Sequence, residues 1–178
     1  MRAVAELAGV SLPTLELAFG TKPRLLEAAI DVAIAGDDEP VAVLARPWAA
    51  CAVATGNAQD FLAIVGAVAG ATLQRSAGLV AAALEAAPGD AALRGLADRL
   101  VAQRLQTAGW IVDRLVERAP LRAGLTRGAA IDSLWILLEP VVYLRLTRDR
   151  GWSPARFEAW LIDSVARLVV DEHQRRSA

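Results

Sequence analysis

The stretch Val4-Ala5-Glu6-Leu7-Ala8-Gly9-Val10-Ser11-Leu12-Pro13-Thr14-Leu15 decides the expected fold at the amino-terminal end of the chain. Small and apolar residues at helical spacing precede Gly9, which can take the left-handed backbone conformation of a tight turn without strain. Ser11 follows as an N-cap, whose hydroxyl accepts a hydrogen bond from the free amides of a second helix. The pattern therefore predicts two short helices, about residues 2–8 and 12–18, joined as a helix-turn-helix and packed through Ala5, Ala8, Val10 and Leu15.

Helical patterning continues along nearly the whole chain of 178 residues. Alanine and leucine dominate, no stretch shows strand-like alternation of β-branched residues, and Gly, Pro, Asp and Asn fall between segments of helical length. The expected fold class is therefore all-α. Further helices are expected over residues 22–35, from Asn57 to Ala87, from Asp90 to Ala119, from Thr126 to about Arg148, and from Ser153 to Glu172.

The segment Gly36-Asp37-Asp38-Glu39-Pro40 is the clearest boundary in the sequence. It combines a helix-stopping glycine, three acids and a proline that resists continuing any helix. We place the domain border there. Residues 1–38 are then a partial helix-turn-helix domain with its linking helix, and residues 39–178 are a helical bundle for ligand binding and dimerisation.

The scarce residue types exclude most catalytic and metal chemistry. The chain has one cysteine, Cys51, and one histidine, His173, so an intramolecular disulfide framework is impossible and most zinc, Ser/His/Asp and Cys/His arrangements are excluded. His173 lies among charged residues near the carboxyl end, where a solvated helix end is expected. We predict no enzyme activity, no cofactor and no metal site, and an α-helical enzyme is the least favoured alternative.

Charge and hydropathy limit the partners and the compartment. The 19 basic and 20 acidic residues nearly balance, so the chain as a whole is not a polybasic nucleic-acid binder. The longest charge-free apolar run, residues 61–74, is shorter than the about 20 residues that a membrane span needs. Glu6 stands where a signal peptide would be apolar. We expect a cytoplasmic protein without membrane association.

The quoted stretch, extended through Leu26, resembles the DNA-binding region of the tetracycline-repressor (TetR) family of transcriptional regulators. That family typically reads Ile/Val-Ala, Ala-Gly-Val-Ser, Thr-Leu-Tyr, Phe-Gly/Pro-Ser/Thr-Lys and Leu-Leu, and the chain has these elements in order between Val4 and Leu26, with Glu16 in place of the tyrosine. The resemblance implies a homodimer that binds operator DNA. It also implies a repressor that is released when a small hydrophobic effector binds the carboxyl-terminal domain.

Residue by residue, the resemblance assigns DNA contact to the second helix and to the start of the next. Ser11 and Thr14 match helix-start positions that touch phosphate or base, and Lys22 matches a family lysine that meets a phosphate. Glu16 replaces a tyrosine that contacts the DNA backbone, and a carboxylate there repels phosphate. The positions implied are Ser11, Leu12, Pro13, Thr14, Glu16, Leu17 and Lys22.

The chain also departs from the family at its start. It begins just before the first helix of the motif, so the preceding family helix, which completes the three-helix domain and often adds basic contacts, is not in this sequence. Residues 1–24 carry Arg2, Lys22 and Arg24 against Glu6 and Glu16, a net charge of +1. A dimeric, ligand-binding helical module with impaired DNA binding is therefore the alternative to a regulator.

The larger domain is expected to hold both the ligand and the dimer interface. The apolar faces of the last two helices exceed what one core needs, which favours a four-helix bundle between two subunits over a monomer. Glu139 on an apolar face needs an arginine or a polar ligand as partner, and Pro140 is expected to kink its helix. The candidate ligand residues, each of which can instead be plain core, are Phe61, Arg104, Trp110, Trp135, Leu138 and Glu139.

Overall fold

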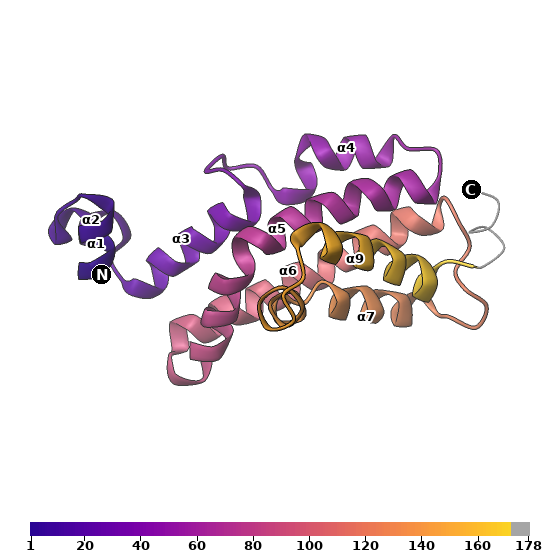
Figure 1. Ribbon diagram of the computed structural model, residues 1–178. Helices are drawn as coiled ribbons and strands as arrows, with labels where there is room; N and C mark the ends of the chain where they lie inside the picture. Colours follow the sequence, from indigo (N-terminus) through magenta and orange to yellow (C-terminus); the bar gives the residue numbers. More distant parts are fainter. Residues whose placement is uncertain (172–178) are drawn as a thin grey trace.

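A computed structural model describes residues 1–171 of the chain, and these residues form no strand beyond one isolated bridge between Leu121 and Val170 (Figure 1). The all-α fold class is confirmed. Two single turns of 3-10 helix (Val43–Ala45 and Ala87–Gly89) and one π-helical turn (Arg145–Asp149) complete the described elements. The α-helices are α1 (Arg2–Ala8), α2 (Leu12–Phe19), α3 (Lys22–Ala35), α4 (Pro47–Val53), α5 (Ala58–Ala86), α6 (Ala91–Val116), α7 (Arg127–Leu137), α8 (Pro140–Leu144) and α9 (Pro154–Val169).

Side-chain caps begin the long helices where the sequence predicts them. The Asn57 side chain accepts from the amide of Asp60 at 2.8 Å, and Asp90 accepts from the amides of the first turn of α6. Thr126 and Ser153 cap α7 and α9 in the same way. These oxygens satisfy amides that have no partner inside the helix, which is why short local patterns locate helix starts well.

The single helix predicted from Thr126 to Arg148 is wrong in its second half. α7 ends at Leu137, and Glu139 takes an extended conformation (φ −67°, ψ 125°) before Pro140 opens α8. The proline ring disfavours the helical conformation for the residue before it, and proline lacks the amide proton that would continue the helix. The expected kink is thus a complete break, after which α8 runs into the π-helical turn.

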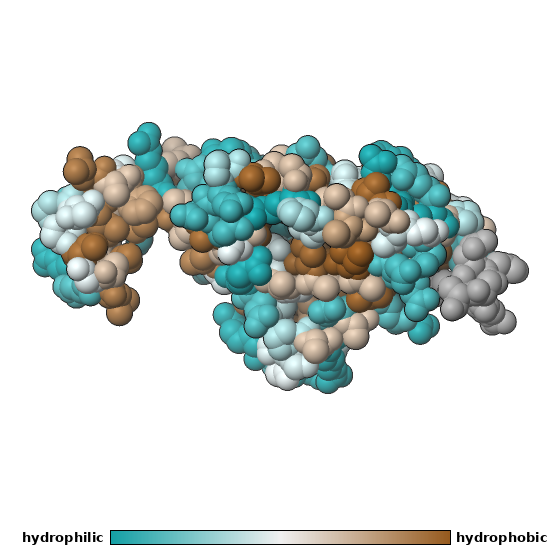
Figure 2. Space-filling view, turned by 90° about the horizontal axis from the view of Figure 1, so that it is seen from above, coloured by the Kyte–Doolittle hydropathy of each residue, from teal (hydrophilic) through white to brown (hydrophobic). Residues whose placement is uncertain are grey.

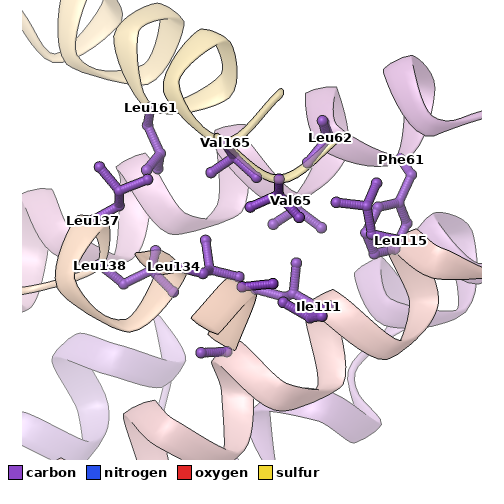
Figure 3. Close-up of a cluster of buried hydrophobic side chains, with 14 of the residues drawn as sticks. Phe61, Leu62, Val65, Ile111, Leu115, Leu134, Leu137, Leu138, Leu161 and Val165 are labelled. Carbon is purple, nitrogen blue, oxygen red and sulfur yellow. The ribbon is translucent and has the colours of Figure 1, made fainter. Parts of the chain in front are cut away.

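α5 is the central helix of the molecule and packs against α3, α4, α6, α8 and α9. Its buried side chains meet those of α6, α7 and α9 in the main hydrophobic core, shown in Figure 3. Labelled members of this core are Phe61, Leu62, Val65, Ile111, Leu115, Leu134, Leu137, Leu138, Leu161 and Val165. A second cluster, Ile30 with Val80, Ala83, Leu96 and Leu100, packs α3 against α5 and α6.

Two glycines on α5 let α9 approach closely. A Cβ placed on Gly66 would overlap Cγ1 of Ile162 and lie 2.7 Å from its Cδ1, so no larger residue fits without displacing that side chain. One turn later, a Cβ on Gly70 would lie 3.6 Å from Cβ of Glu158, an ordinary contact. The close crossing of α5 and α9 therefore depends on Gly66 more than on Gly70.

α1, α2 and the turn between them, called the head below, extend from the rest of the molecule and are joined to it by α3 (Figure 1). Gly9 has the predicted left-handed conformation, with φ 68°. Ala5 and Leu15 are buried as expected, but Ala8 and Val10 are exposed, so half of the predicted contact between the helices is wrong. Two short helices cover only one face of each other, and hydrophobic side chains remain on the outside of the head (Figure 2).

α3 belongs to the larger body through its second half. Ile30 is completely buried in the cluster with Val80 and Leu96. The linking helix thus packs on the larger body, while the domain border at residue 38 stays a prediction. The loop at that border lies against the body, where the guanidinium of Arg46 donates two hydrogen bonds to Asp37, at 2.5 and 2.8 Å.

α5 with the turn that follows it (Ala58–Gly89) is long and apolar enough to cross a membrane, the one such helix in residues 1–171. The charge-free run of residues 61–74 is shorter than this helix because the helix also includes the charged residues Asp60, Arg75 and Glu85. Its position at the centre of the bundle is that of a core helix, and core helices meet the same criteria of length and composition.

Candidate ligand cavity and candidate nucleic-acid interface

A cavity of about 800 Å³ lies between the second half of α3, the middle of α5 and the middle of α6. This volume is in the range of pockets that hold small organic molecules. The loop of residues 37–44 forms a further wall, and Trp48 of α4 contributes its indole ring. Apolar side chains dominate the interior, among them Val65, Val68, Leu73, Val80 and Leu100.

Arg104 of α6 is the basic side chain of the cavity wall, and it is already paired. Its Nη2 forms an ion pair with Oε2 of Glu139, and its guanidinium lies over the ring of Trp135, 4.7 Å from the centroid. Burial lowers the pKa of Arg104, and the neighbouring Glu139 opposes this effect. The partner that Glu139 requires is thus an arginine of the same chain.

The six predicted ligand residues do not form one site. Arg104 and Leu138 line the cavity, whereas Glu139 and Trp135 contact Arg104 without lining it. Phe61 is completely buried in the core, and Trp110 packs against Phe61 and Trp48. The prediction of Phe61, Trp110, Trp135 and Glu139 as cavity-lining residues is therefore corrected: helical spacing identifies inward-facing side chains but not which of them border an empty space.

The cavity wall also contains residues that the sequence did not single out as ligand contacts. Asp37, Asp38 and Glu39 stood out only as a domain boundary, and Trp48 lay in a stretch without a clear pattern. The hydrogen bonds from Arg46 hold the pKa of Asp37 below its usual range. A run of acidic residues after a helix predicts a loop. That this loop borders the same cavity as α5 depends on the tertiary structure.

The predicted DNA-contact positions lie on the surface of α2 and at the first residue of α3. Six of them are exposed and Leu12 is half-buried. The Ser11 hydroxyl caps α2 by accepting from the amide of Thr14 at 3.2 Å, and the two hydroxyls are hydrogen-bonded at 2.7 Å. Leu17 is 91% exposed, so it is not part of the packing between the two helices of the head.

Among residues 1–171, no group of three or more His, Cys, Asp or Glu side chains is placed to hold a metal ion. The one cysteine, Cys51, is exposed. His173 lies outside the described residues, so its expected position at a solvated helix end stays a prediction.

Comparisons of the chain with protein-family models, with curated proteins and with solved structures find no match. Proposals about its function therefore rest on the residues and the geometry described above.

Proposed function

We propose that the chain is a DNA-binding transcriptional regulator of the TetR type, a repressor that leaves its operator when a small hydrophobic molecule enters the cavity. The observation that carries this proposal is the position of α3. Its first residue, Lys22, follows the second helix of the head, and its middle and second half line the cavity through Ala28, Asp31, Val32, Ile34 and Ala35. One helix of 14 residues thus connects the two proposed sites.

A ligand can act on the head through α3 because this helix is held to the body at defined points. Arg99 of α6 forms an ion pair with Glu27, and Arg75 of α5 donates to the carbonyl oxygens of Ala33 at 2.9 Å and Ile34 at 3.4 Å. A molecule that fits the cavity only when α3 shifts favours the shifted state by its difference in affinity. In a dimer, that shift changes the distance between two heads that must reach successive major grooves.

DNA binding is tested by selection of the full chain against a pool of random-sequence duplexes, followed by titration of the enriched duplex at several salt concentrations. We expect an affinity that falls with salt, because Lys22 would meet a phosphate. Lys22→Gln should weaken binding several-fold and reduce the logarithmic salt slope by about 1. The matched control is Arg150→Gln, an exposed charge near the start of α9, which should bind like the parent chain.

A ligand-binding module without DNA recognition is the second candidate, and two observations on the head favour it. The net charge of residues 1–24, the head with the start of α3, is only +1, and Leu7 and Leu17 of the head are each 91% exposed. If no duplex is enriched and the salt dependence is flat for both the parent and Lys22→Gln, the DNA-binding part of the proposal is wrong and this candidate replaces it.

The proposal includes a homodimer formed through the last helices. Apolar side chains stay exposed on α7, α8 and α9, namely Ile136, Val141 and Leu168. A charge placed in such an interface loses its hydration without gaining a partner, so Val141→Arg should weaken the dimer at least about tenfold. Analytical ultracentrifugation over a dilution series measures this change. Val101→Arg, a similarly exposed valine on α6, is the control, and equal behaviour of the two variants would place the interface elsewhere.

A further inference from the structure

The charges around the cavity are distributed unevenly, and this distribution bears on what the cavity can bind. Four acidic side chains contribute to its wall, Asp31 from α3 and Asp37, Asp38 and Glu39 from the loop that follows. Asp37 is held by Arg46. Within residues 1–171, Asp31, Asp38 and Glu39 form no ion pair within 4.0 Å, and all three are exposed, so the cavity opens to solvent beside carboxylates.

The basic groups near the cavity are engaged by other partners. Arg104 is paired with Glu139, Arg46 with Asp37, and Arg99 with Glu27, while Arg75 donates to carbonyl oxygens at the end of α3. In the described part of the chain the Nε atoms of Arg46 and Arg104 have no hydrogen-bond partner, but they are buried and so are not presented to a molecule in the cavity. To be recognised, an anionic ligand would therefore have to break an existing ion pair or, at Arg75, hydrogen bonds to the end of α3, which costs free energy.

The charges of Asp31 and Glu39 are only partly compensated, because the nearby Arg99 and Arg46 form their ion pairs with Glu27 and Asp37. Partial burial raises the pKa of Asp31, and the neighbouring carboxylate of Glu27 raises it further, while Arg99 opposes both. Trp48 supplies an aromatic ring among the lining residues, and aromatic faces attract organic cations.

We propose that the cavity binds a lipophilic organic cation: an apolar body between α5 and α6, and one ammonium group beside Asp31, Asp38 and Glu39. The inference rests on the proposed ligand-responsive function and names the chemical class of its effector. The apolar body is held by the valines and leucines of the interior, which remove it from water. The ammonium stays near the solvent-exposed carboxylates, where it keeps part of its hydration while it gains their attraction.

Three fluorescent probes with one apolar body test this charge preference without DNA. They carry a dansyl group and a five-carbon chain that ends in an ammonium (dansylcadaverine), a carboxylate (dansyl-6-aminohexanoate) or a hydrogen (dansyl pentylamide). Binding to the full chain is followed at low ionic strength by dansyl emission and by energy transfer from tryptophan. We expect the dissociation constant of the ammonium probe to be about tenfold lower than that of the carboxylate probe, with the neutral probe between them.

Paired variants locate the source of the preference. The double variant Asp38→Asn/Glu39→Gln should reduce the ratio between the charged probes to roughly threefold or less, with little change for the neutral probe. Its control is Glu6→Gln/Asp132→Asn, which removes the same charges from α1 and α7 and should leave the ratio unchanged. Circular dichroism of each variant checks that the fold is retained.

The following outcomes of these experiments would overturn the inference. Equal affinity of the three probes, tighter binding of the carboxylate probe, or no binding of the ammonium probe contradicts a cation site at this cavity. A ratio lowered equally by both double variants contradicts the role of the cavity carboxylates. Charge-independent binding of all three probes would leave the proposed hydrophobic effector site in place, and the DNA selection described above tests the proposed regulator independently.

Discussion

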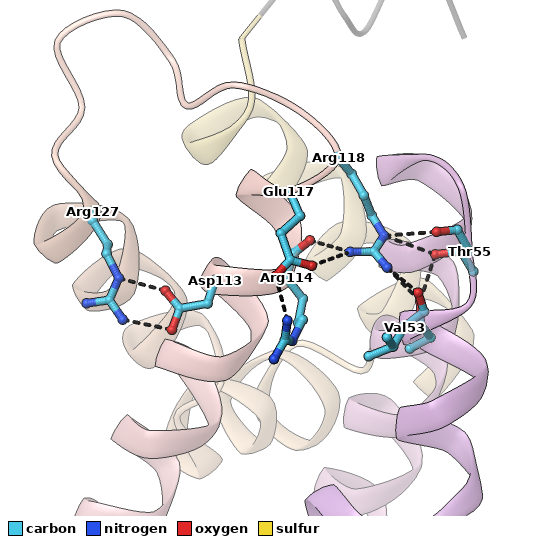
Figure 4. Close-up of polar contacts among 8 residues, drawn as sticks. Val53, Thr55, Asp113, Arg114, Glu117, Arg118 and Arg127 are labelled. Carbon is cyan, nitrogen blue, oxygen red and sulfur yellow. Dashed lines mark hydrogen bonds and ion pairs between the residues drawn. The ribbon is translucent and has the colours of Figure 1, made fainter.

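Arg118→Met is expected to lower the free energy of unfolding by about 3 kcal/mol, which corresponds to roughly 10 °C in Tm for a chain of this size. The side chain of Arg118 is 7% exposed and lies between the ends of α4 and α6 (Figure 4). It donates to the carbonyl oxygens of Val53 and Arg114, each at 2.5 Å, and to the carbonyl and hydroxyl oxygens of Thr55 at 3.2 and 3.3 Å.

The size of this effect follows from what methionine leaves behind. It keeps an apolar stem against Phe61, but it leaves carbonyl oxygens at two helix ends without the donor that now satisfies them. It also removes a positive charge from the carboxyl-terminal ends of two helix dipoles. Arg118→Lys, which keeps the charge but not the planar set of donors, should lie between the parent chain and Arg118→Met.

The same substitution at an exposed arginine provides the control. Arg127 pairs with Asp113 through two hydrogen bonds, at 2.7 and 2.9 Å, but the two side chains are 58% and 46% exposed (Figure 4). Water can replace the lost contacts there, so Arg127→Met should cost less than about 1 kcal/mol. Urea denaturation followed by circular dichroism measures all three variants. Similar losses for Arg118→Met and Arg127→Met would mean that solvent satisfies the helix ends equally well.

Gly66→Ala is expected to destabilise the chain by about 2 kcal/mol, although alanine normally strengthens a helix. The added methyl group would occupy the place of the Ile162 side chain, so α9 must move away from α5 or Ile162 must leave its rotamer. Gly78→Ala on the same helix is the control. A Cβ there meets nothing within 4 Å, so this change should stabilise the chain by roughly 0.5 to 1 kcal/mol.

A double-mutant cycle separates the clash from other effects of Gly66→Ala. Ile162→Ala removes the overlapping atoms, so the double variant Gly66→Ala/Ile162→Ala should be more stable than the sum of the single changes predicts, by at least about 1 kcal/mol. Thermal and urea unfolding of the four chains give the coupling. Additive losses would show that the two residues do not compete for the same space.

The sequence predicted the local features of the fold well because they depend on neighbouring residues. Ser11, Asn57 and Asp90 cap helices where their spacing to the following amides indicated, and Gly9 takes the turn conformation that its missing side chain allows. The break at Pro140 was underestimated. A proline in an apolar helix pattern indicates that the helix bends. The size of the bend depends on whether neighbouring elements hold the separated ends, as the ion pair of Arg104 with Glu139 does here.

The candidate sites were predictable to different degrees. The head was located entirely from residues close together in the sequence, and its predicted surface positions are exposed apart from the half-buried Leu12. The cavity could not be located from the sequence, because its walls come from α3, a loop, α4, α5 and α6. Side chains that line a cavity also have the same spacing in the sequence as core side chains. Phe61 and Trp110 have the spacing of cavity residues, yet one is completely buried and the other packs on its ring.

The sequence by itself determined the all-α class, the helix starts, the turn of the head and the scarcity of groups for metal or nucleophilic chemistry. These follow from composition and from interactions within about one helical turn, which any sequence displays directly. Only the tertiary structure decided that Arg104 pairs with Glu139, that Gly66 admits Ile162, and that the acidic segment after α3 borders a cavity. Those contacts join residues far apart in the chain, and which of them form depends on how whole helices pack, a property that no local pattern contains.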